Sequence, residues 1–324
     1  MAPKLPRLDA RIHQWDFDRL IERNCPICGS ADAQVAFVER PDGLGIRTCG
    51  KCHALYVSPA PSSEQLEAFY GNYDAKHRRA SRINAGELAS SYQEANPLAD
   101  LRIRELSSLM KIESSRVLDI GFGRAHFLYC LKKLGAIPLG LELDAQAVEF
   151  ARFLGIDVLQ GNLADLADEP KFDLITLLDL VEHPLDPMTM LRKSSELLRR
   201  RGLLMIWTPN GDYADPEKSQ TTFRVDLEHM QYITPRACLY IASELKLDII
   251  HLETLGFPAL KGIDKPVAKD EVPASLLKRR LKSIPGFAAV NRIRRRLFGG
   301  CRAVNRLADE RMGSYNLFCI LQKP

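Results

Sequence analysis

The chain has 324 residues, which is enough for about two domains with buried cores. Hydrophobic residues make up 46% and charged residues 27%, and no uncharged apolar run approaches the ~18 residues of a membrane span. This balance excludes a fibre, a short peptide and an integral membrane protein. The first residues lack the apolar stretch of a secretory signal, so we expect a cytoplasmic protein without disulfides.

Four cysteines give the first strong pattern, in a segment bounded by residues 21–60. Cys25/Cys28 and Cys49/Cys52 form two C-x2-C pairs with 20 residues between them. Thiolates two residues apart in a tight turn can both bind one ion, and two such turns complete the tetrahedron that zinc prefers. Because four thiolates leave no open position, we predict a structural zinc ion in a zinc ribbon rather than two redox-active pairs.

The segments on either side of this unit differ in pattern. Residues 1–20 combine charge with Pro and show no period, so we expect a loosely docked N-terminal tail. Residues 61–112 have a helix-start signal and apolar side chains at helical spacing. They predict helices over 62–70 and 97–111, which form a linker and a lid.

Residues 113–324 alternate short apolar runs with longer amphipathic ones. Alternating strands and helices indicate a parallel sheet covered on both faces, and such sheets bind ligands at the carboxyl ends of their strands. The predicted fold class is therefore α/β. The predicted strands cover residues 116–120, 138–143, 157–159, 172–178, 203–208, 247–253 and 315–321.

A glycine turn follows the first of these strands. Gly121 and Gly123 come directly after the buried run that holds Asp119, and a helix follows them. Glycines let the backbone pass close to a ligand, and a helix N-terminus favours an anionic group. Glu142 ends the next strand about twenty residues on, where a carboxylate can accept hydrogen bonds from both hydroxyls of a ribose. His126 stands where a dinucleotide fingerprint needs glycine, which argues against NAD.

Further motifs follow along the same domain: Gly161-Asn162, Phe172-Asp173, a Leu-Asp-Leu-Val-Glu-His-Pro-Leu-Asp-Pro run at 178–187, and a Glu-His-Met-Gln-Tyr-Ile-Thr run at 228–234. Together with the glycine turn, they resemble the motifs of class I S-adenosylmethionine (SAM)-dependent methyltransferases, and most closely the ubiquinone-biosynthesis-like branch. The resemblance covers about residues 24–260 and the last strand. It implies a Rossmann-like methyltransferase fold with a mostly parallel sheet, an antiparallel last strand, and SAM as methyl donor.

The resemblance also implies eight residues that line the cofactor site. They are Asp119, Gly121 and Gly123 at the methionine part, Leu178 and Asp179 beside the sulfonium, Glu142 at the ribose, and Asn162 and Leu163 at the adenine. Two positions depart from the family. Ala125 stands in place of a usual third glycine and Asn162 in place of an Asp, but a small side chain and an amide carbonyl can serve there.

Methyl transfer needs an aligned acceptor and, where the acceptor loses a proton, a base. His183 follows the fourth strand of the domain, and His229 lies in the segment that faces the acceptor in relatives. Glu182 and Tyr232 are close to them in sequence. These four residues are the catalytic candidates, and the alternative for the Glu-His pair is that it only caps or orients a loop.

A basic segment interrupts the domain at about residues 261–312, with 14 Lys and Arg against 5 Asp and Glu. We expect a helical insertion here. Residues 275–298 interleave apolar and cationic side chains, as does an amphipathic helix on an anionic membrane surface. Such a helix would suit peripheral contact with the inner face of the membrane and a lipid-linked glycan acceptor. The plainer alternative is a solvated basic face.

Taken together, the motifs favour methyl transfer to a small-molecule or saccharide acceptor. One alternative is an RNA methyltransferase that holds phosphates with the zinc ribbon and the basic insertion. The fourth strand lacks the Asn-Pro-Pro-Tyr pattern of many base N-methyltransferases, so RNA is the weaker alternative, and no DNA partner is expected. A second alternative is a SAM-binding scaffold without catalysis. The sequence does not distinguish O-, N- and C-methylation.

Overall fold

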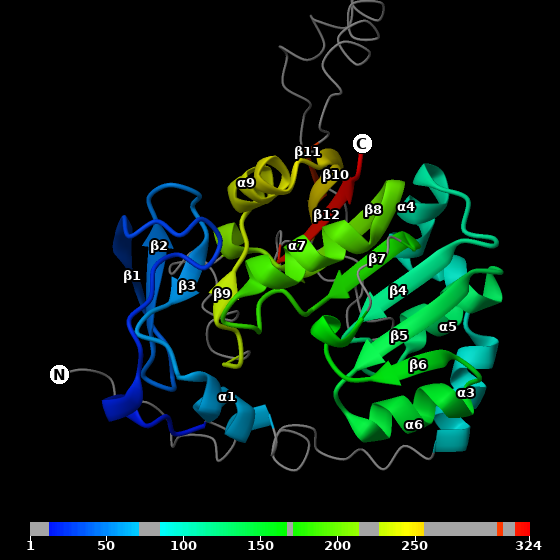
Figure 1. Ribbon diagram of the computed structural model, residues 1–324, viewed down its shortest axis with the longest axis horizontal. Coiled ribbons are helices and arrows are strands. Elements are labelled where there is room, and N and C mark those ends of the chain that lie inside the picture. Colours follow the sequence, from blue (N-terminus) through cyan, green and yellow to red (C-terminus); the bar gives the residue numbers. More distant parts are fainter. Residues whose placement is uncertain (1–12, 71–84, 167–170, 214–226, 256–302, 307–314) are drawn as a thin grey trace, which may run out of the picture.

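The computed structural model describes residues 13–70, 85–166, 171–213, 227–255, 303–306 and 315–324. They build a large sheet flanked by helices, with a smaller sheet beside it (Figure 1). None of the described helices combines the length and apolar character that crossing a bilayer requires. Residues 1–12 and most of the predicted basic insertion, including 275–298, lie outside the described residues.

The large sheet has eight strands in the order β11-β10-β12-β8-β7-β4-β5-β6. The strands from β8 to β6 are parallel to their neighbours, whereas β12 runs antiparallel to both β8 and β10. This confirms the predicted parallel α/β sheet with an antiparallel last strand. The strands are β4 (Arg116–Ile120), β5 (Ile137–Glu142), β6 (Asp157–Gln160), β7 (Phe172–Leu178), β8 (Leu198–Pro209), β10 (Asp248–Leu255), β11 (Ala303–Arg306) and β12 (Asn316–Gln322).

The direction of chain progression reverses beside β4. From β4 the chain moves outward to β5 and β6, and then returns to β7 on the other side of β4. In open parallel sheets such a reversal leaves a crevice at the carboxyl ends of the two central strands, here β4 and β7. The site is therefore expected where these strands end.

Side chains of the central strands alternate between two cores. On β8, Leu204 and Ile206 belong to one core, whereas Met205 and Trp207 belong to the other. Helices α7 and α9 cover the first face, and α4, α5 and α6 cover the second (Figure 1). Burial on both faces explains why these strands are continuous apolar runs in the sequence. The helices are α1 (Ser63–Tyr70), α3 (Ala85–Glu94), α4 (Leu101–Leu109), α5 (His126–Lys133), α6 (Ala145–Phe153), α7 (Pro187–Leu197) and α9 (Pro235–Leu245).

The smaller sheet joins the cysteine unit to the large domain. Its order is β1 (Ala33–Glu39), β2 (Gly45–Cys49), β3 (Leu55–Val57) and β9 (Gln231–Tyr232). Strand β9 comes from the connection between β8 and α9, and it pairs antiparallel with β3 (Figure 1). The predicted acceptor-facing segment is thus an edge strand of the cysteine unit's sheet.

Several elements differ from the sequence predictions. Trp15, in the predicted loose tail, is buried and donates its indole N–H to Asp42 at 3.0 Å. Strand β2 was not predicted. Strand β11 lies within the stretch predicted as a helical insertion, about 261–312, so that prediction is wrong at Ala303–Arg306. Helix α3 lies in the predicted helical segment 61–112, between the two helices expected there, and the second of these begins as a 3-10 turn at Pro97–Ala99. Short, half-polar elements of this kind carry little periodic signal of their own and form against neighbours that are distant in sequence.

Candidate functional site

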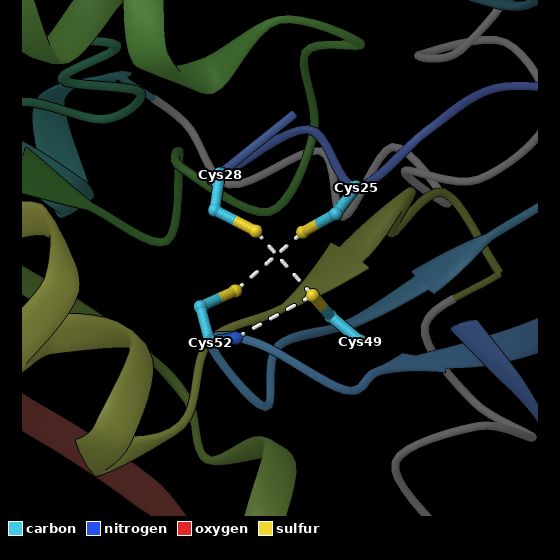
Figure 2. Close-up of side chains that lie close together, drawn as sticks. All are labelled: Cys25, Cys28, Cys49 and Cys52. Carbon is cyan, nitrogen blue, oxygen red and sulfur yellow. Dashed lines mark hydrogen bonds between the residues drawn. The ribbon is translucent and has the colours of Figure 1, made fainter. Parts of the chain in front are cut away.

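The four cysteines converge on one point. Cys25 and Cys28 come from the turn before β1, whereas Cys49 ends β2 and Cys52 lies in the turn between β2 and β3. Their sulfur atoms point toward a common centre (Figure 2), with 3.5 Å between Cys25 and Cys52 and 3.4 Å between Cys28 and Cys49. All four ligand atoms lie within 4.8 Å of one another. Because four thiols at this spacing match a closed tetrahedral thiolate site, the donor set fits zinc.

Backbone and thiol hydrogen bonds link the four cysteines and shift the pKa values of their thiols in different directions. The N–H groups of Lys51 and Cys52 both donate to Cys49 Sγ, at 3.4 and 3.5 Å. A hydrogen bond from the Cys52 thiol lowers the pKa of Cys25 to about 5. Burial raises the pKa of Cys28 to about 11, and the hydrogen bond with Cys25 raises the pKa of Cys52. Metal binding needs the thiolate form, so an ion bound here would displace protons from these thiols.

The glycine turn after β4 lies against Glu142 at the end of β5. The Gly123 N–H donates to Glu142 Oε2 at 2.9 Å, and the Leu143 N–H donates to Oε1 at 2.8 Å. Gly121 and Gly123 have φ values of 69° and 53°, which suit glycine because it lacks a Cβ. Two motifs that the sequence placed separately are therefore joined by a hydrogen bond, and the half-exposed Glu142 carboxylate keeps further acceptor capacity.

Asp119 is buried in β4 just before this turn. The Thr176 hydroxyl on the neighbouring β7 donates to Asp119 Oδ1 at 2.6 Å. Burial raises the pKa of Asp119 to about 7, although Thr176 and the Arg102 guanidinium favour its charged form. The carboxyl group can thus change its charge near neutral pH when a cation binds beside it.

The other predicted cofactor residues surround the same sheet edge. Asn162 is exposed and caps a 3-10 turn, accepting from the Ala164 N–H at 2.9 Å, and Leu163 in that turn is buried. At the end of β7, Leu178 is half-buried and Asp179 is exposed with a φ of 49°. The structure brings both pairs to the carboxyl ends of the strands.

The predicted catalytic residues form a cluster after β7. Possible ligand atoms of Glu182, His183 and His229 lie within 4.8 Å of one another, close enough to share one divalent ion. His229 Nε2 is 3.9 Å from Glu182 Oε1, and the Thr208 hydroxyl donates to Glu182 Oε2 at 2.9 Å. The rings of His183 and His229 meet edge to face with centroids 4.9 Å apart. Tyr232 is fully buried beside His229, and its hydroxyl accepts from Arg40 at 3.4 Å.

Burial keeps both imidazoles neutral. It lowers the pKa of His229 well below its usual value, and the neighbouring His183 and Arg40 lower it further. Desolvation also lowers the pKa of His183, against the opposing charge of Glu228. His229 Nδ1 is buried and has no hydrogen-bond partner among the described residues. A neutral ring with a nitrogen of this kind can take up a proton or bind an ion.

Comparison with known proteins identifies the family. The model of the methyltransferase domain family matches residues 90–252, about half of the chain. The chain belongs to this family. The match spans α4, the glycine turn, Glu142 and the β7 cluster, and it confirms the predicted family and the class I methyltransferase fold.

Individual relatives cover smaller parts of the chain. The ubiquinone biosynthesis O-methyltransferase of Pelagibacter ubique (strain HTCC1062) is 31% identical over 133 residues, which are 39% of this chain and 55% of that protein. The protein of the same name from Xanthomonas oryzae pv. oryzae (strain PXO99A) is 30% identical over 121 residues, or 35% and 51% of the two chains. This methyltransferase-family chain thus spans about half the length of these curated relatives.

Solved structures show a weaker likeness. A SAM-dependent methyltransferase from Archaeoglobus fulgidus has a TM-score of 0.45 and 18% identity, with coverage of 79% of this chain and all of that chain. The fold assignment therefore depends on the family match and on the strand order rather than on this likeness.

Arg102 is a further residue of the site in this family member, and the sequence patterns did not reveal it. Its guanidinium pairs with Asp100 at 2.6 Å and lies 5.2 Å from the centre of the Trp207 ring. The charges of Asp119 and Asp179 also act on it. In the sequence Arg102 is one of two arginines on an amphipathic helix, so no spacing rule singles it out.

We expect one zinc ion per chain, held by the four cysteines. Cys49→Ser should lower the zinc content at least several-fold and expose residues 21–60 to proteolysis, because a unit of this size depends on its metal to fold. Elemental analysis of purified protein measures the zinc, and Cys238→Ala, in the main core, is the matched control that should keep it. Full zinc content in the Cys49 variant would contradict the assignment.

Proposed function

We propose that this chain transfers a methyl group from SAM to a small-molecule acceptor bound beside His183 and His229. One observation carries the proposal: Asp119 near the end of β4, Glu142 at the end of β5 and the Glu182–His183 pair after β7 lie at the same edge of the sheet, and His229 lies against Glu182. A cofactor held by Asp119 and Glu142 would lie next to groups able to act on an acceptor.

In the cofactor assignment, each charged group of SAM faces a side chain of opposite charge. SAM supplies a methyl group already activated on a sulfonium. Glu142 can accept hydrogen bonds from the ribose hydroxyls, and the Asp119 carboxyl group would bind the amino group of the methionine part. Arg102 offers a guanidinium for the carboxylate of the methionine part. Asn162 and Leu163 would flank the adenine, and Leu178 and Asp179 would line the sulfonium.

His229 is the base that the geometry favours. A neutral imidazole can accept a proton from the acceptor, and Glu182 at 3.9 Å can stabilise the imidazolium that forms. Thr208 holds the Glu182 carboxylate in place through its hydroxyl. His183 lies beside this pair and can orient the acceptor or share the proton, while Tyr232 packs behind His229.

A small molecule is the acceptor class that the relatives support, since they are named for ubiquinone biosynthesis. A saccharide, including a lipid-linked glycan, is a finer form of the same proposal. The RNA alternative and the membrane-contact prediction both depend on the basic insertion, most of which lies outside the described residues. The zinc ion would stabilise the cysteine unit and take no part in chemistry, because four thiolates close its coordination.

Glu142→Ala should weaken SAM binding by at least about tenfold. A charge-assisted hydrogen bond contributes about 1.5–3 kcal/mol, and each 1.4 kcal/mol is a factor of about ten in affinity. Calorimetric titration with SAM measures the effect, and Glu149→Ala on the exposed side of α6 is the control. An unchanged dissociation constant for the Glu142 variant would refute its role at the ribose.

SAM binding should release a proton from Asp119 at about pH 6. With its pKa raised to about 7, the free carboxyl is mostly protonated there, and the bound ammonium group favours the ionised form. Affinity should therefore rise as pH increases toward 7 and then level off. Calorimetry in two buffers of different ionisation enthalpy counts the proton. Asp119→Asn should lose the release, and equal release from this variant and the wild type would show that the proton comes from elsewhere.

His229→Gln should reduce methyl transfer by about 10² to 10⁴, the usual contribution of a general base, while SAM affinity stays within about twofold. The assay follows label from methyl-labelled SAM into a small-molecule extract of the host. The control is His126→Gln, on an exposed part of α5. Transfer at the wild-type rate by the His229 variant would remove this residue from the chemistry.

A further inference from the structure

A fully buried arginine, Arg40, lies between the cysteine unit and the acceptor-facing segment, defined here as residues 227–232. It directly follows β1, and its side chain has no exposed surface. The guanidinium forms a bidentate ion pair with the Asp42 carboxylate: Nε is 3.0 Å from Oδ1, and Nη2 is 2.7 Å from Oδ2. Asp42 is itself fixed by the indole N–H of Trp15. Arg40 is therefore held in one orientation from the cysteine-unit side.

The remaining N–H groups of Arg40 reach the acceptor-facing segment. Nη1 donates to the carbonyl of His229 at 2.5 Å and to the Tyr232 hydroxyl at 3.4 Å. Nη2 also donates to the carbonyl of Leu227. Two carbonyls from residues 227 and 229 thus meet one planar group, which fixes the curve of the backbone at His229.

The opposite side of the segment is fixed by the loop after β7. The Met230 N–H donates to the carbonyl of Glu182 at 2.8 Å. The Gln231 side chain donates to the carbonyls of Val181 and Pro184, both at 2.7 Å. The acceptor-facing segment therefore lies between Arg40 and the Glu182–His183 turn, and its position determines where the His229 ring meets Glu182.

Arg40 donates five hydrogen bonds, and all three nitrogen atoms of its planar guanidinium group take part. A lysine places three donors at one point and cannot serve Asp42, two carbonyls and a hydroxyl together. A buried guanidinium is costly to desolvate, and an apolar side chain of similar size is often as stable in such a place. An apolar side chain could fill this space if the role were purely structural. Holding the carbonyls of Leu227 and His229 together with the Tyr232 hydroxyl requires an arginine.

We propose that Arg40 is a positioning residue, which holds residues 227–232 in the conformation that places the His229 ring against Glu182. The inference rests on the proposed function, in which His229 accepts the proton of the acceptor. It assigns the cysteine unit a part in catalysis: this unit supplies Arg40 and Asp42, and the β3–β9 pairing brings the segment to them. The zinc ribbon would then frame the acceptor site rather than act as a separate module.

The test compares Arg40→Lys with the wild type in two measurements. Hydrogen exchange of the full chain, followed by mass spectrometry, should be at least tenfold faster in residues 227–232 and unchanged in β2 and β3. Methyl transfer into the small-molecule extract should fall at least tenfold in kcat, with zinc content and SAM affinity retained. Arg47→Lys is the matched control, because the side chain of this half-exposed arginine on β2 pairs with Glu22 at 3.7 Å and donates to the carbonyl of Ser58, and neither partner belongs to residues 227–232. It should change neither measurement.

The outcomes separate this inference from the proposed function. Wild-type exchange and wild-type transfer in Arg40→Lys would overturn the positioning role, and so would faster exchange throughout the cysteine unit, which marks a merely structural residue. If the single variant fails to fold, Arg40→Met combined with Asp42→Asn removes both buried charges and should still accelerate exchange in residues 227–232. If the wild type transfers no methyl group at all, the proposed function fails, and the exchange comparison still decides whether Arg40 holds the segment.

Discussion

The antiparallel pairing of β3 with β9 is the contact on which the arrangement of this molecule depends. It joins a strand of the cysteine unit to two residues that lie between β8 and α9 of the large domain. Because the Met230 carbonyl accepts from the Val57 N–H at 2.9 Å and Tyr232 pairs with Leu55, the backbone directly after His229 is held against β3. The cysteine unit and the parallel sheet thereby meet at the candidate site.

A second constraint, the reversal of strand order beside β4, shapes the edge of the large sheet where the proposed cofactor site lies. The carboxyl ends of β4, β5 and β7 meet there, and each carries a carboxylate at or within one residue of its end: Asp119, Glu142 and Asp179. Their surroundings separate their properties. Asp119 is buried with a raised pKa, whereas Glu142 is half-exposed and fixed by backbone N–H groups. A ligand bound at this edge would meet one carboxyl group whose pKa is about 7 and one carboxylate that backbone N–H groups already hold in place.

Much of the fold and of the candidate site was predictable from the sequence, for reasons that differ from residue to residue. The two C-x2-C pairs and the glycine turn with its downstream Glu142 are local patterns with a chemical cause, so their positions followed from spacing alone. Strands that are buried on both faces, such as β12, appear in the sequence as uninterrupted apolar runs, and the run itself identifies the strand. Glu182 and His183 are adjacent in the sequence, so their proximity was evident. His229 was predicted as a catalytic candidate from the resemblance to class I methyltransferases.

The remaining features depend on contacts between distant residues. Arg40 and Arg102 are ordinary arginines in the sequence, and only folding buries one against residues 227–232 and places the other beside Trp207. Strand β9 has two residues, too few for any period, and exists because β3 lies beside it. Trp15 is buried for the same kind of reason, since its partner Asp42 is 27 positions away.

The central claim is that this family member methylates a small molecule. The most direct test is to incubate the purified protein with methyl-labelled SAM and a lysate of its host, and then to separate lipid, glycan, RNA, protein and small-molecule fractions. The account predicts label in the small-molecule fraction, or in the glycan fraction for a saccharide acceptor. Label confined to RNA would contradict the proposed acceptor, and no label in any fraction despite measured SAM binding would contradict catalysis.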